Sequence, residues 1–334
     1  MMLSKKLKMA ALGMAAVMSF GLIAGCGSQS QSGTDKKYSV GVVQLVEHDA
    51  LDAANKGFVD ALKERGFEEG KNLTIDNQNA QADQSNLQNI GQRFVTNKVD
   101  LIYAIATPAA QTVANLTKDI PIVGSAITDY VGAKLVKSNE APGGNVTGTS
   151  DMNPIKEQVD LLMKLCPNAK TIGCVYTSSE VNSEIQFKAM KEYAESKGLK
   201  VEAATISTVN DIQQAVQSLT GKVDAFYVPT DNVIASAMPT MAAVAMEAKK
   251  PIICGESNMV KAGGLATYGV DYYQLGRQSG MMAADILEGK SKPATMEIQF
   301  SKNLKAVINK GVADKLGITI PADVLKDAET INYF

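Results

Sequence analysis

The stretch VDLIYAIATPAAQ, residues 99–111, carries the pattern that decides the fold. Residues 99–103 form a β-branched and aromatic run that is typical of a buried strand. We expect a helix to open soon afterwards, with Thr107 as its N-cap and Pro108 at its first helical position. The stretch VDAFYVPTDN, residues 223–232, repeats this order in the second half of the chain. The chain therefore contains at least two similar strand–helix units.

The same alternation of short strands and amphipathic helices continues along most of the chain. Strands separated by helices of 10–15 residues predict βαβ units and parallel sheets covered on both faces. Residues 121–125 and 251–257 form a second matching pair, which predicts one β-α-β-α-β core in each half. Because any two βα units share Val, Ile and a Pro at the strand start, chance similarity stays open as an alternative. The predicted strands are 39–43, 73–75, 99–103, 121–123, 171–176, 199–206, 223–228 and 251–254.

Length and connections predict two lobes. About 300 residues follow the amino-terminal segment, more than one hydrophobic core usually holds. We predict an α/β protein with two doubly wound, parallel-sheet lobes. Residues 142–150 and 265–270 suit extended crossovers between the lobes, and after the second crossover Asp271 is expected to cap a helix with Gln274 as its partner. A chain that crosses twice forms a hinge, and a hinge creates a cleft that closes.

The first 25 residues have the order of a secretory signal. Three lysines precede an apolar run at residues 9–23, which is too short to cross a bilayer. The sequence Ile-Ala-Gly-Cys at 23–26 resembles a bacterial lipobox and implies a diacylglycerol anchor on Cys26. We predict a signal peptide at 1–25, a flexible tether at 26–37 and a lipid-anchored protein on the extracytoplasmic face of the membrane. A plain signal peptide with an incidental cysteine is the alternative.

Composition excludes several classes of function. The formal net charge is −2 with no basic cluster outside the signal, which argues against binding to nucleic acid. His48 is the only histidine, so we expect no multi-histidine metal site. Cys166, Cys174 and Cys254 form no disulfide framework, although a Cys166–Cys174 bridge stays open. No G-x-S-x-G elbow, P-loop or dinucleotide fingerprint is present, so we predict neither an enzyme nor a cofactor.

Polar side chains gather where the predicted strands end. Ligands of open α/β sheets bind beyond the carboxyl ends of the strands, at the starts of helices. A helix start such as Thr107-Pro108 attracts carboxylates, and an acid such as Asp129 suits an ammonium group. An Asp at a turn is more often only a local cap. The candidate ligand-binding residues are Gln44, Glu47, His48, Thr107, Pro108, Gln111, Thr128, Asp129, Ser150, Asp151, Tyr227, Asp231, Asn232 and Glu256.

These residues resemble an ABC-importer substrate-binding protein with the periplasmic-binding-protein-like class I fold. The chain is most similar to the family that includes bacterial tryptophan- and tyrosine-binding lipoproteins. The resemblance covers about residues 38–310 and departs from the family pattern at His48-Asp49-Ala50, where a Pro after the His is expected. The matching stretches are 44–51 with Gly57-Phe58, 106–111, 148–151, 227–232 and 268–276.

The resemblance implies a division of the chain and a function. It implies a first lobe of 38–147 plus 270–300 and a second lobe of 148–269 plus 301–334. It also implies capture of a free amino acid, aromatic (Tyr, Trp or Phe), followed by hinge closure and delivery to the membrane subunits of an ABC permease. We expect the protein to act as a monomer. A surface adhesin or a ligand sensor that uses the same fold is the alternative.

Physical chemistry suggests, as a hypothesis, how such an amino acid is held. Helix starts at Thr107 and Ser150 would receive the α-carboxylate, and Asp129 or Asp231 would pair with the α-ammonium. Tyr103, Tyr227 or Tyr268 would form an aromatic wall, although a core role for these tyrosines is open as well.

Overall fold

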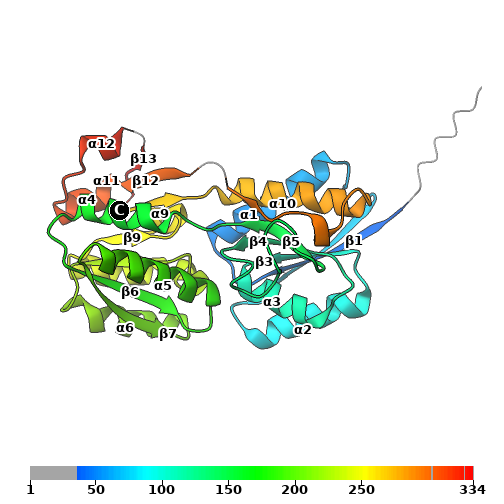
Figure 1. Ribbon diagram of the computed structural model, residues 1–334, viewed down its shortest axis with the longest axis horizontal. Helices are drawn as coiled ribbons and strands as arrows, with labels where there is room; N and C mark the ends of the chain where they lie inside the picture. Colours follow the sequence, from blue (N-terminus) through cyan, green and yellow to red (C-terminus); the bar gives the residue numbers. More distant parts are fainter. Residues whose placement is uncertain (1–35, 302–303, 327, 334) are drawn as a thin grey trace, which may run out of the picture. The chain divides into compact units, whose positions relative to one another are not determined.

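Two sheets of mainly parallel strands organise the chain in the computed structural model, which describes residues 36–301, 304–326 and 328–333 (Figure 1). The expected signal peptide, Cys26 and nearly all of the expected tether lie outside the described residues. The first sheet has the strand order β11-β5-β4-β3-β1-β2 and the second β13-β12-β10-β9-β8-β6-β7. We call each sheet, with the helices that pack on it, a lobe. The α/β fold with two parallel-sheet lobes is therefore confirmed.

The elements of the first lobe come from two parts of the chain. Its strands are β1 (Tyr38–Gln44), β2 (Leu73–Asn79), β3 (Leu101–Ile105), β4 (Ile122–Ile127), β5 (Val146–Ser150) and β11 (Gln299–Phe300). Its helices are α1 (Asp49–Glu64), α2 (Gln84–Asn97), α3 (Thr107–Leu116) and α10 (Tyr272–Leu287).

The second lobe contains the rest of the described elements. Its strands are β6 (Thr171–Thr177), β7 (Lys200–Ile206), β8 (Ala225–Val228), β9 (Ile252–Cys254), β10 (Ala266–Gly269), β12 (Lys305–Asn309) and β13 (Ala328–Ile331). Its helices are α4 (Ile155–Leu165), α5 (Val181–Ser196), α6 (Ile212–Thr220), α7 (Asn232–Ser236), α8 (Met238–Glu247), α9 (Ser257–Lys261), α11 (Lys310–Leu316) and α12 (Ala322–Leu325).

The two lobes repeat one topology. The order β2-β1-β3-β4-β5 in the first sheet corresponds to β7-β6-β8-β9-β10 in the second. The sequence pairs 99–103 with 223–227 and 121–125 with 251–257 fall at β3 with β8 and at β4 with β9, so the predicted internal repeat is confirmed. Each lobe therefore has its topological switch point, where α/β ligands bind, between its first and third strands.

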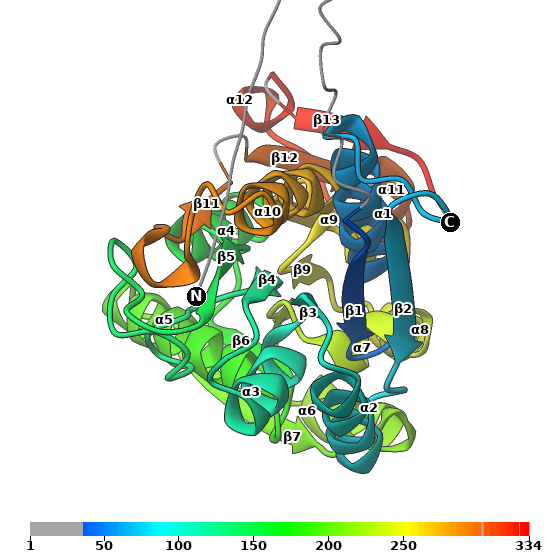
Figure 2. The same cartoon turned by 90° about the vertical axis from the view of Figure 1, so that its right-hand side faces the viewer.

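Helices cover both faces of each sheet. In the first lobe α1 and α10 lie on one face and α2 and α3 on the other (Figure 2). The pair α1–α10 packs backbone to backbone, because a Cβ added at Gly276 would lie 1.9 Å from the carbonyl oxygen of Ala54. In the second sheet alternate residues face opposite cores, with Tyr227 in one and Phe226 in the other. Packing in these cores holds the strands in place, and thereby positions the polar side chains at the strand ends.

Some local predictions need correction. Residues 265–270, expected as a crossover, contain β10, which belongs to the second sheet and pairs with β12 in antiparallel orientation. The strand β5 continues to Ser150, so it lies on both sides of the boundary expected between 147 and 148. The cysteines Cys166 and Cys174 are free, so the bridge left open by the sequence is absent. The cap of α10 is confirmed, because Asp271 accepts a hydrogen bond from the backbone N–H of Gln274 at 3.1 Å.

Candidate functional site

The carboxyl ends of strands from both sheets meet in a layer of polar side chains. The imidazole Nε2 of His48, after β1, lies 3.4 Å from the amide oxygen of Asn232 at the start of α7. The hydroxyls of Thr128, after β4, and Thr230, after β8, lie 3.4 Å apart. Gln186 of α5 donates to Thr128 at 3.3 Å and to Thr230 at 2.6 Å. The predicted corners of both halves are therefore brought together.

Asp151 is the buried acid of this layer on the side of the first lobe. Its side chain is 3% exposed and follows directly after β5. It accepts a hydrogen bond at 2.7 Å from the hydroxyl of Tyr272 and one at 3.2 Å from the hydroxyl of Thr128. Burial raises the pKa of Asp151, and hydrogen bonds from the two hydroxyls and from its own backbone N–H compensate only in part. Two hydroxyl partners leave a carboxylate with spare acceptor capacity.

Glu180 and Asp231 are the buried acids on the side of the second lobe. Backbone N–H groups of Asn232 and Val233 donate to Glu180, and those of Thr177 and Ile234 donate to Asp231. Burial, with Asp231 nearby, raises the pKa of Glu180 to about 8, and burial raises that of Asp231 as well. These acids serve the backbone of their own lobe, and Asp231 caps α7.

Glu256 caps the next helix. It accepts hydrogen bonds from the backbone N–H groups of Asn258 at 2.6 Å and Met259 at 2.8 Å, at the start of α9. Burial raises its pKa to about 7. The buried charged side chains in the described part of the chain are thus Asp151, Glu180, Asp231 and Glu256, without a buried Lys or Arg. An interior of this kind favours a cationic group on whatever it binds.

Several buried polar atoms of the layer have no hydrogen-bond partner among the described residues. They are the hydroxyl of Thr107, Nδ1 of His48, both amide atoms of Asn153 and the amide oxygen of Asn182. Burial lowers the pKa of His48 against the opposing hydrogen bond to Asn232, so its imidazole is neutral at pH 7. Because native structures pair nearly all buried polar groups, this concentration at the strand ends indicates a ligand site.

Two predicted helix starts are wrong in detail. Ala106, with φ 84° and ψ 153°, precedes α3, so Thr107 is the first helical residue and not the N-cap. No helix starts at Ser150, because it ends β5 and α4 begins at Ile155. The hydroxyl of Ser150 instead donates to the carbonyl oxygen of Thr128 at 2.8 Å.

The other predicted residues have varied places. Gln44 is buried and donates to Asp52 at 2.6 Å, which fixes the corner after β1, and Glu47 is exposed. Asp129 is half-buried and accepts from the backbone N–H groups of its own turn, at residues 131 and 132. Pro108 and Gln111 line a pocket beside α3.

The tyrosines lie in the cores rather than in the polar layer. Tyr103 stacks on Phe58 with ring centroids 3.7 Å apart, inside the first lobe. Tyr227 is fully buried in the second lobe and its hydroxyl donates to Gln158 at 2.8 Å. This corrects the assignment of Tyr227 to the ligand site, because its ring and its hydroxyl both have partners in the core.

Sequence reasoning missed five members of the layer: Asn153, Glu180, Asn182, Gln186 and Tyr272. Glu180 follows the carboxyl end of β6, so the rule that selected the corner after β1 would have found it. Gln186 lies two turns inside α5, and its glutamine amide carries no signal in a helix pattern. Its role depends on the approach of the two lobes.

The described residues contain no group of three His, Cys, Asp or Glu side chains arranged to hold a metal ion. Within the same residues, no helix has the length and apolar character to cross a membrane. The layer consists of acids, hydroxyls and amides, which are groups that bind and orient a small polar molecule.

Residues 39–332 match the family model of ABC transporter substrate binding proteins. The chain belongs to this family. It is 47% identical over 296 residues to a tyrosine-binding protein of Clostridioides difficile, with 86% of each chain covered. The binding-protein fold and the resemblance seen in the sequence are therefore confirmed, and the family is one of substrate-binding proteins rather than enzymes.

Solved structures support the same placement. The binding protein is 45% identical to an ABC domain from Streptococcus pneumoniae in complex with L-Trp, with a TM-score of 0.85 and coverage of 88% of this chain and 99% of that one. It is 44% identical to a Clostridium difficile substrate-binding protein with adhesive properties in its ligand-free, open structure, with a TM-score of 0.68 and coverage of 89% and 100%. The two identities are nearly equal, yet the TM-score with the L-Trp complex is higher than that with the ligand-free, open structure. The hydrogen-bond contacts between the two lobes of this chain agree with that difference.

Proposed function

We propose that this chain is an extracytoplasmic binding lipoprotein of an ABC importer that captures a free aromatic amino acid and delivers it to a permease. The similar tyrosine-binding protein and the L-Trp complex support the ligand class. The lobes would follow the division 38–147 plus 270–300 and 148–269 plus 301–334, with the first boundary moved past Ser150, where β5 ends, and Cys26 would carry the anchor. The proposal includes delivery to a permease, which the description of the family supports, and action as a monomer.

The hydrogen-bond partners of the Asp151 carboxylate are the observation on which the assignment of an amino-acid ligand rests. Glu180, Asp231 and Glu256 are occupied by backbone N–H groups of other residues, whereas Asp151 has two hydroxyl partners and no backbone partner but its own N–H. A free amino acid has an ammonium group, which supplies the donors and the positive charge that a buried carboxylate lacks. We therefore assign the α-ammonium to Asp151, in preference to Asp129, whose carboxylate already serves its own turn.

The start of α3 suits the α-carboxylate. The helix is 10 residues long, and its first turn has backbone N–H groups without helical partners. The hydroxyl of Thr107 lies in the same turn, buried and without a partner among the described residues. An amino acid bridging Thr107 and Asp151 would satisfy both groups at once.

Thermal unfolding against a panel of single amino acids tests the ligand class. A ligand at a thousand times its dissociation constant adds about 4 kcal/mol to the folding free energy. In a protein of this size that is a rise in Tm of roughly 10 °C. We expect the rise with Tyr, Trp or Phe, and a flat response to the whole panel would refute the amino-acid assignment.

Two variants test the contact assignment. Asp151→Asn keeps the shape and removes the charge, so we expect tyrosine affinity measured by calorimetry to fall by about 10- to 100-fold, as for a buried charged hydrogen bond. Asp129→Ala is the matched control and should bind within about twofold of the parent. The reverse ranking would place the ammonium at Asp129.

Adhesion is a second candidate function, because one similar structure is described as having adhesive properties. A variant Asp151→Asn that loses tyrosine but keeps binding to host cells would show that the two activities use different surfaces. Loss of cell binding together with tyrosine binding would make adhesion dependent on the closed form.

A further inference from the structure

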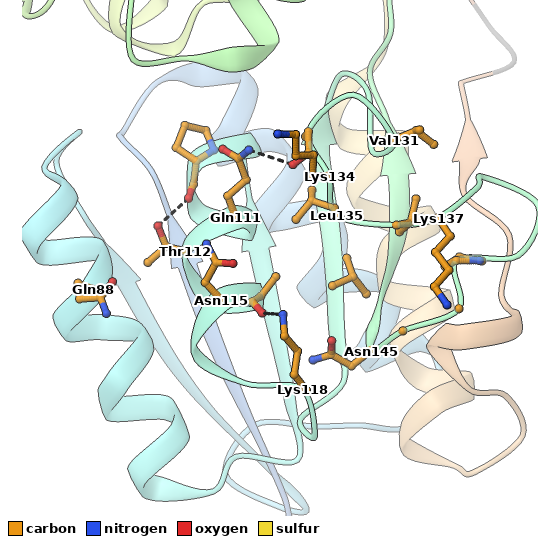
Figure 3. A pocket seen from close by; sticks show the side chains of 18 of the residues that line it. Gln88, Gln111, Thr112, Asn115, Lys118, Val131, Lys134, Leu135, Lys137 and Asn145 are labelled. Carbon is orange, nitrogen blue, oxygen red and sulfur yellow. Dashed lines mark hydrogen bonds between the residues drawn. The ribbon is translucent and has the colours of Figure 1, made fainter.

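A basic pocket lies beside α3, apart from the buried polar layer (Figure 3). Its volume is about 780 Å³, within the range that holds small molecules. The walls come from the start of α2, the outer side of α3, the loop after β4 and the Gly-rich loop before β5. Ser179, after β6 of the second lobe, closes one edge.

The charges around this pocket have one sign. Lys118, Lys134 and Lys137 line it, and no Asp or Glu is among the described residues that do. None of the three lysines has an ion pair to a described acid, whereas several lysines elsewhere do, among them Lys56, Lys71, Lys188, Lys191 and Lys290. In a chain with a net charge of −2, three unpaired cations around one hollow are a local excess.

Neutral hydrogen-bonding groups lie between the cations. Figure 3 shows Asn145 between Lys118 and Lys137 in that view, with Asn115 on the neighbouring turn of α3. Asn145 is held by donating to the carbonyl oxygens of Thr117 at 3.1 Å and Ile120 at 2.8 Å. Both N–H groups of the Asn145 amide are thereby used, so the donors that remain for the oxygens of an anion are those of the lysine ammonium groups and of Asn115.

The loop that supplies Lys134 is fixed in an uncommon conformation. Lys134 has φ 60°, a left-handed value that residues other than Gly rarely adopt. The loop is held by Gln111, which donates to the carbonyl oxygen of Ala133 at 3.0 Å, and by the backbone N–H of Leu135, which donates to Tyr130 at 2.9 Å. Strained backbone of this kind occurs at ligand sites, where the surrounding structure maintains it.

We propose that this pocket binds a small polyanion, a molecule with two or more carboxylate or phosphate groups, through Lys118, Lys134 and Lys137. Lys118 follows α3, whereas Lys134 and Lys137 lie on the loop after β4, so a multivalent anion contacts cations of both segments and a monovalent one does not. The competing explanation is that the lysines only solvate the surface, with Lys118 capping the end of α3 through its bond to the carbonyl oxygen of Ala114.

Calorimetry on the full-length chain in a neutral detergent tests the proposal, with citrate and pyrophosphate as probes at low salt. We expect saturable binding with one site per chain, weakened by added NaCl and absent with acetate. The triple variant Lys118→Gln, Lys134→Gln, Lys137→Gln should lose at least tenfold in affinity. Two sources of the anion are separated by the probes, since a phosphate site prefers pyrophosphate and a carboxylate site prefers citrate.

A charge-matched control separates a site from general attraction. The triple variant Lys170→Gln, Lys200→Gln, Lys222→Gln changes the net charge equally at exposed positions of the second lobe. It should bind both probes as the parent does. The proposal would be overturned if neither probe bound saturably at concentrations up to about 10 mM, which is about a hundred times a Kd of 0.1 mM. An equal loss of affinity in both triple variants would overturn it as well. Tyrosine is titrated separately, so failure at the polar layer is distinguishable from failure here.

Discussion

Replacement of Gly276 by Ala tests the close packing of α1 on α10. A Cβ at this position would lie 1.9 Å from the carbonyl oxygen, 2.6 Å from the carbonyl carbon and 2.8 Å from the Cα of Ala54. These are backbone atoms, so no side chain can rotate away, and the two helices must separate by roughly 1.5 Å to reach an ordinary contact.

The sign of the effect distinguishes packing from helix propensity. In an exposed helix interior, Gly→Ala stabilises by about 1 kcal/mol. Overpacking costs about 1–3 kcal/mol, and a rigid backbone neighbour places this site at the upper end. We therefore expect a net loss of about 2 kcal/mol and a Tm lower by roughly 4–8 °C.

Thermal unfolding by circular dichroism measures this change. Gly221→Ala is the control, because Gly221 has nothing within 4 Å of an added Cβ and an ordinary φ of −80°. It should leave the Tm within about 1 °C of the parent. A Gly276→Ala protein more stable than the parent by about 1 kcal/mol would refute the backbone contact, since the propensity gain would then be all that remains.

Three further predictions concern titration and the polar layer. Because burial lowers the pKa of His48 from 6.5, the one imidazole of the protein should titrate below pH 6.5 by NMR, with stability lost as pH falls; a midpoint at or above 6.5 contradicts its burial. Glu256 has a pKa raised from 4.5 to about 7, so the folded state binds more protons between these values and its stability falls as pH rises. The free energy of unfolding of Glu256→Gln, relative to the parent, should accordingly rise by up to about 3 kcal/mol from pH 5 to pH 8, and a flat difference would contradict the raised pKa. Tyr272→Phe removes a donor from buried Asp151 and should cost about 1–3 kcal/mol in urea unfolding, whereas Tyr333→Phe, at a residue that is 57% exposed, should cost nothing measurable.

The fold was predictable because its signals are local and periodic. The helix at Val181–Ser196 has the predicted bounds, and the strands at 171–176 and 199–206 are within a residue or two of theirs. The repeated strand order follows from the sequence repeat, since each strand–helix unit buries its apolar face in the same way. The Gly-rich segments were harder, because an extended crossover and an edge strand have the same composition and differ only in their partners.

The sequence was sufficient to predict where the candidate site lies in the fold, but not the role of each residue in it. The strand-end rule selected His48, Thr128, Asp151 and Asn232, which the structure brings into one layer. The rule cannot tell which acids the backbone already occupies. That depends on helix starts, and these differ by one residue from the prediction at Thr107, where Ala106 adopts a positive φ.

The polar contacts between the lobes are too weak to hold the closed form by themselves. His48 with Asn232, Thr128 with Thr230 and Gln186 with Thr128 meet at 3.3–3.4 Å, longer than normal hydrogen bonds. Neutral bonds contribute about 0.5–1.5 kcal/mol each even at good geometry. Conversion of a mostly open population to a mostly closed one takes about 5.5 kcal/mol. The buried groups without partners oppose closure further, so a molecule that pairs with them must supply most of the difference, and closure then reports that the molecule is bound.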